Sequence, residues 1–377
     1  MTRCGLALLL CLLTMALTLR ISFGAEPETW SVEQYFDLEQ LTDALPEEGR
    51  EVLDELGLDA SGTDSLLALS PEQFLKTAGA AFSDAFRQPA RMLAVLTGAA
   101  LLTLMLDGFQ DLHGNRTMKP VFGAVTVLCL AAVVAGPVLD CLGDASRTVD
   151  GAAGFLTAYI PVMTGILLTA GRSASAVSYN TLMFLGCEGA AQLIHSVFLP
   201  VTGILLALGL TGAVTGDSRL SGVSRMIRKT AGWALGLVLI LFIGLMTLQT
   251  GVSAAADTVA SRSAKYLLGS LVPVVGSSVS DAVMAARGCV DLIRTSVGGF
   301  GLVAVAAIFL LPAVRVLAWY CAFSAGAFLG ELLGAGPLRS LMENFASGFG
   351  LLLSVLAAFA AVAASCTGLL LSVGGAG

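Results

Sequence analysis

The sequence predicts an all-α polytopic membrane protein with about seven to nine transmembrane or re-entrant helices and a small, acidic, helical N-terminal segment outside the cytoplasm. The composition supports this, because 56% of the residues are hydrophobic and only 12% are charged, about half the share of roughly 25% found in soluble domains. Several uncharged stretches reach the roughly 20 residues that a helix needs to cross the hydrocarbon core. The apolar runs are continuous and lack the two-residue alternation of barrel strands, so helices are expected.

Residues 1–24 are predicted to be a signal peptide. Arg3 precedes an uncharged run that ends at Leu19, which is short for a span but has the length of a signal-peptide core. Ser22 and Gly24 place small residues at the two positions that a signal peptidase reads. The alternative is an uncleaved anchor, and both alternatives place the following segment outside the cytoplasm.

Residues 25–88 are predicted to form an acidic extracytoplasmic segment of short helices. Between residues 26 and 87 the chain has fifteen acidic and three basic residues, and Ser31 followed by Gln34 is a capping-box pattern. This stretch contains no His, Cys or glycine-rich phosphate loop. We therefore expect a small solvated domain or a docking surface, and no catalytic unit.

The remaining chain, residues 89–377, is predicted to be a multi-span membrane domain. Its uncharged runs have the length of membrane-crossing helices, and short polar connectors separate them. Spans are expected near residues 90–106, 120–139, 152–171, 190–215, 230–256, 296–314, 316–334 and 346–373.

The orientation of these spans follows from Lys and Arg in short connectors, which favour the cytoplasm. This rule places residues 107–119, Arg172 and residues 217–229 in the cytoplasm. Reaching the last connector from Arg172 on the same side requires an even number of crossings. Residues 177–216 are therefore expected to form two short spans or a re-entrant hairpin broken at Pro200.

Residues 258–295 are predicted to be a re-entrant or interfacial region. The stretch is apolar at first, is interrupted by Pro273 and Gly276, and then becomes charged. Irregular backbone at membrane depth survives only where it is buried in protein or lines a cavity. We therefore expect a pore or assembly region that contains Arg262, Lys265, Pro273, Gly276 and Asp281.

Glycines at four-residue spacing predict close packing of helices. The chain has 43 glycines, among them the pair Gly232 and Gly236 and the series Gly326, Gly330 and Gly334. Small residues at this spacing let helices approach closely in lipid, within one subunit or between copies of it. A homo-oligomer is therefore a possible assembly.

Glu188 and His195 are the candidates for chemistry inside the membrane. They lie seven residues apart, on one face of a helix, and ionisable residues at membrane depth often mark a proton path. The other interpretation is that Glu188 is solvated near an interface and His195 is hydrogen-bonded. The first interpretation predicts a self-contained, proton-coupled small-molecule permease.

Other chemistry is not expected from this sequence. It contains no GxSxG, no HExxH and no P-loop, and its two histidines and eight cysteines show no metal-ligand spacing. We therefore expect no catalytic residues, no cofactor and no metal. Nucleic-acid binding is not expected either, because no basic stripe is interleaved with aromatic residues.

One stretch is similar to a known family. The run RSAKYLLGSLVPVVG, from Arg262 to Gly276, is followed by Asp281-Ala282 and by Gly288-Cys289. Together with Tyr159-Ile160-Pro161, it resembles stage III sporulation protein AE of endospore-forming bacteria. The order of leader, acidic segment and multi-span remainder matches as well, so the resemblance extends over essentially the whole chain.

The resemblance implies a non-enzymatic role in sporulation. Proteins of this family are expected in the mother-cell membrane around the engulfed forespore, within a channel-like assembly of stage III sporulation proteins AA to AH. That assembly includes a cytoplasmic ATPase and joins stage II sporulation protein Q from the forespore side. For this chain, the resemblance implies a multi-pass subunit that supports forespore development after engulfment.

Overall fold

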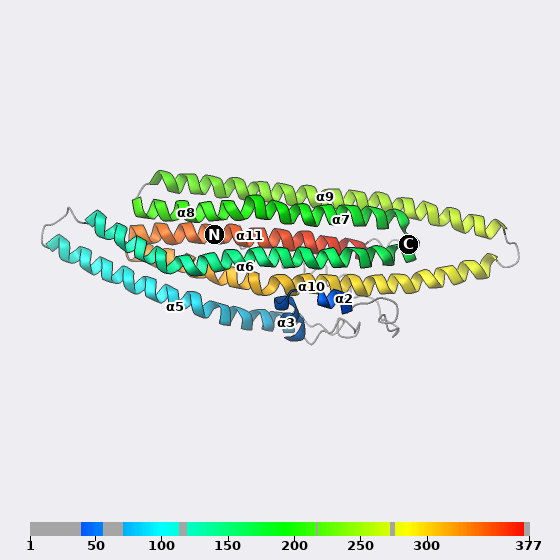
Figure 1. Cartoon of the computed structure of the whole chain (residues 1–377), viewed down its shortest axis with the longest axis horizontal. Helices are drawn as coiled ribbons and strands as arrows, with labels where there is room; N and C mark the ends of the chain where they lie inside the picture. Colours follow the sequence, from blue (N-terminus) through cyan, green and yellow to red (C-terminus); the bar gives the residue numbers. More distant parts are fainter. Residues whose placement is uncertain (1–38, 56–70, 113–118, 216–217, 272–275, 373–377) are drawn as a thin grey trace.

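The computed structural model describes residues 39–55, 71–112, 119–215, 218–271 and 276–372. Within these residues every long element is a helix, and the helices lie side by side along one axis (Figure 1). The elements are α2 (Glu39–Asp43), α3 (Glu47–Glu55), α5 (Pro71–Leu112), α6 (Lys119–Thr169), α7 (Ser173–Leu193), the π-helix η3 (Ile194–Phe198), α8 (Leu199–Thr215), α9 (Ser218–Leu271), α10 (Gly276–Leu332) and α11 (Gly336–Ser372).

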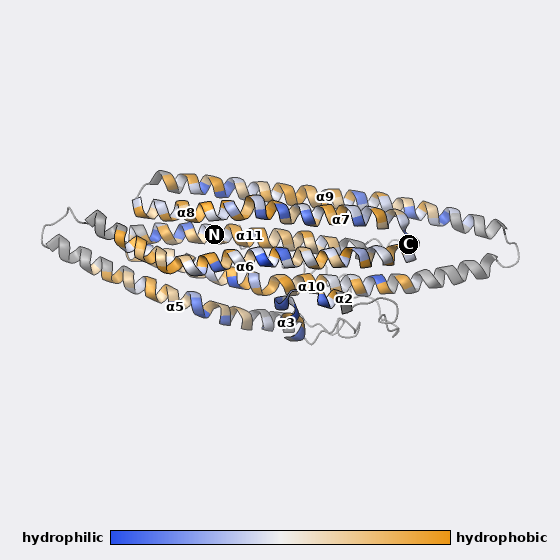
Figure 2. Cartoon of the chain, in the orientation of Figure 1, coloured by the Kyte–Doolittle hydropathy of each residue, from blue (hydrophilic) through white to orange (hydrophobic). Residues whose placement is uncertain are grey.

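The prediction of an all-α polytopic membrane protein is confirmed. Five helical stretches among the described residues are long and apolar enough to cross a membrane. Figure 2 shows apolar residues along most of the length of the long helices, with hydrophilic residues prominent in α3 and in the neighbouring part of α5. The five stretches are Val125–Thr169, Ser173–Thr215, Gly222–Ser263, Ile293–Leu332 and Leu338–Gly368.

The antiparallel pair α10 and α11 forms the centre of the bundle. In each of these two helices 61% of the most apolar stretch is buried, compared with 11% in α9, which lies at the edge. Phe323 of α10 packs between two rings of α11, with centroid separations of 5.4 Å to Phe345 and 5.1 Å to Phe349. Offset aromatic contacts of this kind add to the burial of apolar area.

Two of the predicted glycines bring α10 and α11 close together. A Cβ at Gly330 would lie 2.9 Å from the backbone nitrogen of Arg339, and one at Gly326 would lie 3.1 Å from the sulfur of Met342. Gly334 has a φ of 70° at the turn between the helices, a conformation that disfavours other residues. A Cβ at Gly232 or Gly236, by contrast, would lie more than 4 Å from any packing partner, so packing between copies there stays a prediction.

Two predicted connectors are helical instead. The spans expected at 120–139 and 152–171 both lie in α6, and those expected at 296–314 and 316–334 both lie in α10. The charged residues between them suggested loops, but polar side chains do not break a helix when they find partners on neighbouring elements. Arg315, for example, lies 3.0 Å from Glu48 of α3.

The two short spans or re-entrant hairpin expected at residues 177–216 are wrong, because Ser173–Thr215 is one continuous helical stretch. Helices α7 and α8 run on in one direction (Figure 1) through the π-helical turn Ile194–Phe198. Proline has no N–H to donate and its ring crowds the preceding turn, and a widened π turn accommodates both effects. Consequently Arg172 and the start of α9 lie at opposite ends of the bundle, and their expected placement on one side is also wrong.

Candidate functional site

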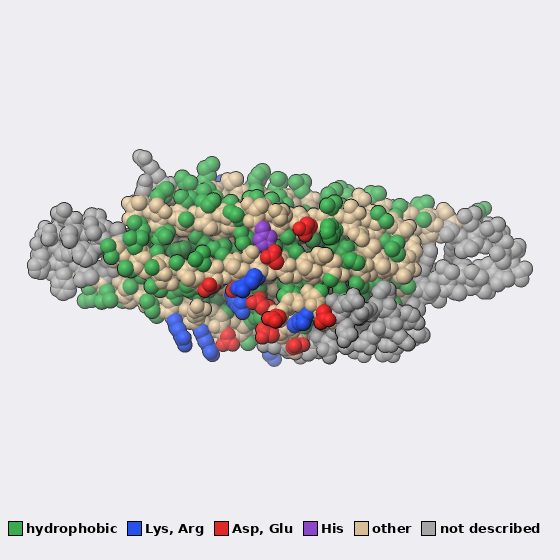
Figure 3. Space-filling model, in the orientation of Figure 1, with side chains coloured by type: hydrophobic (Ala, Val, Ile, Leu, Met, Phe, Trp, Pro, Cys, Tyr) green, Lys and Arg blue, Asp and Glu red, His purple; other side chains and the backbone are tan. Residues whose placement is uncertain are grey.

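Charged side chains gather halfway along the bundle. Figure 3 shows acidic, basic and histidine side chains together in the middle of one face, with apolar surface on either side. We call this group the central charge cluster, and its members come from α3, α6, η3 and α10. They are Glu48, Asp144, Arg147, Asp150, His195 and Arg315.

Arg315 forms ion pairs with two acidic residues in one half of the central charge cluster. Its Nη1 lies 3.0 Å from Oε1 of Glu48 and 3.7 Å from Oδ2 of Asp144. Asp144 also pairs with Arg147, one helical turn further along α6. The guanidinium of Arg315 therefore links the acidic N-terminal segment to the bundle, since Glu48 belongs to α3.

Apolar contacts dock the same segment. A Cβ at Gly151 of α6 would lie 2.7 Å from the ring of Pro46, and one at Gly49 would lie 3.1 Å from Ile308 of α10. The leucine and valine residues that face the bundle from α2, α3 and the turn between them are at most 3% exposed. Thus α2 and α3 pack on α6 and α10, with most of their described acidic residues exposed and Glu48 paired with Arg315. These buried side chains are Leu41, Leu45, Val52 and Leu53.

His195 belongs to the other half of the cluster. Its Nε2 lies 2.8 Å from Oδ1 of Asp150, and its Nδ1 lies 3.4 Å from Oγ of Ser146. The geometry of this contact with Asp150 is not that of a hydrogen bond. Glu188 is exposed on α7. Within the described residues, no contact joins its side chain to His195. The proton relay therefore stays a prediction.

The predicted pore or assembly region lies at one tip of the bundle. Arg262 is exposed on α9, which also contains Lys265, and Gly276 begins α10, which contains Asp281. Pro273 and the side chains of Lys265 and Asp281 lie outside the described residues. The role of this region stays a prediction.

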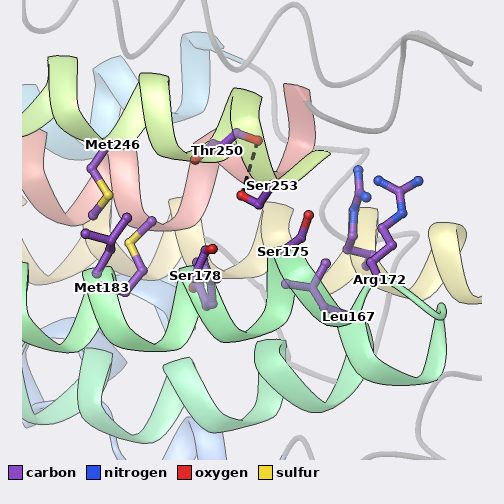
Figure 4. Close-up of a pocket in the computed structure, with 11 residues that line it drawn as sticks. Leu167, Arg172, Ser175, Ser178, Met183, Met246, Thr250 and Ser253 are labelled. Carbon is purple, nitrogen blue, oxygen red and sulfur yellow. Dashed lines mark hydrogen bonds between the residues drawn. The ribbon is translucent and has the colours of Figure 1, made fainter. Parts of the chain in front are cut away.

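A polar pocket that no sequence pattern predicted forms where α7 begins. Figure 4 shows Arg172, Ser175 and Ser253 turned toward one small cavity, with Thr250 hydrogen-bonded to Ser253. Arg294 of α10 also lines this pocket although its side chain is only 2% exposed. The cavity has a volume of about 10 Å³, which is room for one water molecule.

Asp257 fixes the first turn of α7 beside this pocket. Its two carboxylate oxygens accept hydrogen bonds from the backbone N–H groups of Ala174 and Ser175, each at 2.9 Å. These are amides that a helix start leaves without an intrahelical partner, and a carboxylate there also interacts favourably with the helix dipole. Asp257 is buried, so it is a structural cap.

The arrangement provides charge pairing and packing. Among the residues that the structure describes, no group of three or more His, Cys, Asp or Glu side chains could hold a metal ion. Two buried thiols do meet across the bundle, since the sulfurs of Cys187 and Cys366 are 3.3 Å apart. Their separation of 179 positions in the sequence explains why no local pattern predicted the contact.

Comparisons with known proteins agree on one similarity. The family model for stage III sporulation protein AE matches residues 62–373. The stage III sporulation protein AE of Bacillus subtilis (strain 168) is 23% identical over 334 residues, which cover 85% of this chain and 82% of that protein. No solved structure matches the chain significantly.

Proposed function

The chain belongs to the stage III sporulation protein AE family, and we propose that it is a non-enzymatic integral membrane subunit of a channel-like sporulation assembly between mother cell and forespore. Its location in this proposal is the mother-cell membrane around the engulfed forespore. Its partners are the other stage III sporulation proteins AA to AH, including a cytoplasmic ATPase, and stage II sporulation protein Q. Its role is to support forespore development after engulfment.

The extent of the family match carries this proposal. Residues 62–373 include every long helix from α5 to α11. A match of this extent covers turns and charged connectors as well as apolar spans, so it does not arise from hydrophobic composition alone. The multi-pass helical bundle is consistent with a membrane subunit, and membership of the family supports a role in sporulation.

The charge distribution supports one orientation in the membrane. Arg225, Arg228 and Lys229 lie near the start of α9, and Arg339 lies near the start of α11, at the same end of the bundle (Figure 1). Basic residues that flank spans favour the cytoplasm. In the proposed orientation this end is cytoplasmic, and the end of α11 at Ser372 lies on the opposite side.

Deletion of the gene in its own host tests the proposal. We expect normal vegetative growth, completed engulfment and a failure of forespore development afterwards, with spore yield restored by a wild-type copy. Fluorescence of a tagged copy should gather around the engulfed forespore. A wild-type spore yield in the deletion strain would refute the proposal.

The permease alternative requires proton transfer through Glu188 and His195. Asp150 and Ser146, the contacts recorded for His195, come from α6, which supports a role in packing. Purified protein in liposomes distinguishes the two functions. Solute flux that follows a pH gradient and is lost in Glu188→Gln would favour the permease, and we expect no such flux.

A further inference from the structure

A second cavity lies between α8, α9 and α11, and it is larger and more charged than the pocket at the start of α7. Its volume is about 180 Å³, whereas one water needs about 10–15 Å³ of such space. A phosphate group with part of a glycerol therefore fits. We call this cavity the basic cleft. Its lining residues are Leu205, Ser224, Arg225, Arg228, Gly336, Arg339, Ser340, Glu343, Asn344 and Ser347.

The basic cleft has more positive than negative charge. Three arginines and one glutamate line it. Arg339 is engaged by two carboxylates, at 3.2 Å from Glu331 and 3.9 Å from Glu343. Within the described chain no ion pair is recorded for Arg225 or Arg228, which are exposed and three residues apart on α9. Residues at this spacing lie on neighbouring positions of a helix face, so two guanidinium groups are available together.

Neutral donors complete the lining. Ser340, Asn344 and Ser347 come from successive turns of α11. The side-chain amide of Asn344 gives one N–H to the carbonyl of Ser340, at 2.8 Å, which leaves its second N–H available. Gly336, at the N-terminal end of the 37-residue helix α11, also lines the cleft, and helix N-termini favour anions. Guanidinium groups, amide donors and a helix start are the usual partners of phosphate oxygens.

The position of the basic cleft on α9 favours a lipid phosphate over a soluble one. Directly after Lys229 the helix has no charged residue until Asp257, and one face of this stretch is exposed, with Trp233 68%, Ile240 74% and Leu241 63% exposed. An exposed apolar face of this length contacts lipid, and Trp is enriched where such a face meets the headgroups. The two arginines thus lie where a lipid phosphate would be.

We propose that the basic cleft between α8, α9 and α11 binds the phosphate group of an anionic phospholipid, with Arg225 and Arg228 as its principal ligands. Basic pockets between membrane helices on the cytoplasmic side are suited to such headgroups. The proposal depends on membrane insertion of the bundle, and it does not depend on the sporulation partners. A bound lipid would join α9, the least buried of the candidate spans, to α8 and α11.

Native mass spectrometry of the purified full-length protein tests the proposal, with phosphatidylglycerol as the probe and phosphatidylcholine as the neutral comparison. We expect the wild type to retain phosphatidylglycerol in preference to phosphatidylcholine. The double variant Arg225→Gln/Arg228→Gln should bind it at least about tenfold more weakly, because it lacks two charge-assisted contacts. The matched control Arg87→Gln/Arg91→Gln removes the same charge from exposed positions of α5 and should retain the lipid.

Two outcomes would overturn the proposal. One is equal retention of phosphatidylglycerol by the wild type and by the Arg225→Gln/Arg228→Gln variant, with circular dichroism showing both folded. The other is a thermal shift with inorganic phosphate or glycerol 3-phosphate that is lost in this variant, without any preference for phosphatidylglycerol. That result would assign the basic cleft to a soluble phosphate. Spore yield does not enter either outcome, so the proposed function and the lipid site fail separately.

Discussion

Arg315→Gln tests whether the central charge cluster holds the N-terminal helices on the bundle. The substitution keeps much of the side chain and its hydrogen-bonding capacity but removes the cation between Glu48 and Asp144. Glu48 then loses this ion pair, whereas Asp144 keeps its pair with Arg147. We expect α3 to detach from α10 more often, while the long helices stay packed.

The magnitude of this effect is set by exposure. Full charges 3.0 Å apart attract by roughly 1.4 kcal/mol in water. The side chains of Arg315 and Glu48 are 43% and 39% exposed, which places the pair near that aqueous limit, and comparable pairs contribute about 0.2–1 kcal/mol. Together with the weaker contact to Asp144, the substitution should lower the free energy that holds α3 on the bundle by about 1 kcal/mol. The equilibrium constant for opening should then rise about fivefold. By contrast, Leu53→Ala should cost about 2–5 kcal/mol because this side chain is buried.

Limited proteolysis measures this opening directly. Arg50 lies inside α3, so trypsin cuts after it only when the helix opens. The rate of this cut should rise about fivefold in Arg315→Gln and more in Leu53→Ala. The matched control is Arg87→Gln, which breaks a pair with Asp84 in which both side chains are about three-quarters exposed. An unchanged rate after Arg50, or an equal rise in the control, would refute the role of the cluster.

Three further predictions test packing and topology. Mild oxidation should join Cys187 to Cys366 in a disulfide, because their sulfurs are 3.3 Å apart. Peptide mapping should find this disulfide in the wild type and in the Cys129→Ser control. Its absence would contradict the contact between α7 and α11. Gly301→Ala should lower the thermal midpoint in detergent, since its Cβ would lie 2.7 Å from the buried ring of Tyr159 and overpacking costs about 1–3 kcal/mol. Gly299→Ala, two residues away, should be tolerated because its Cβ would lie more than 4 Å from any packing partner. Equal midpoints for both variants would count against the packing of α6 on α10. Single cysteines at Ser173 and Gly222, in a cysteine-free background, should react with an impermeant reagent from opposite sides of the membrane. Labelling of both cysteines from one side would support a hairpin at Pro200 and contradict the continuous path of α7 and α8.

Much of the fold was predictable because helix formation in lipid depends on local composition. Uncharged runs such as 230–256 and 346–373 indicated helices that are present in α9 and α11. The connectors were harder, because charge suggests a loop only when the charge is solvated. Residues 140–151 contain Asp140, Asp144, Arg147 and Asp150, yet they continue α6, since Arg315 and His195 of other helices meet their carboxylates.

The candidate site was less predictable than the fold, because its members come from distant segments. His195 was singled out as an ionisable residue in an apolar setting, but its contacts with Asp150 and Ser146 depend on how α6 packs against η3. Glu48 and Arg315 are 267 positions apart, so no spacing rule connects them. Asp257 directly follows the expected span 230–256, and only its burial and its hydrogen bonds at the start of α7 identify it as a cap.

The error in topology came from giving every arginine equal weight. The positive-inside rule concerns solvated cations in short connectors, and Arg172 was counted as one of them. In the structure Arg172 lines a pocket with Arg294, close to where Asp257 caps α7, so its position is set by packing. Arg225 and Arg228 are exposed, with no ion pair recorded within the described chain, which is the condition under which the rule applies. With Arg172 left out of the count, α7 and α8 need only one crossing, as their continuous helical path requires.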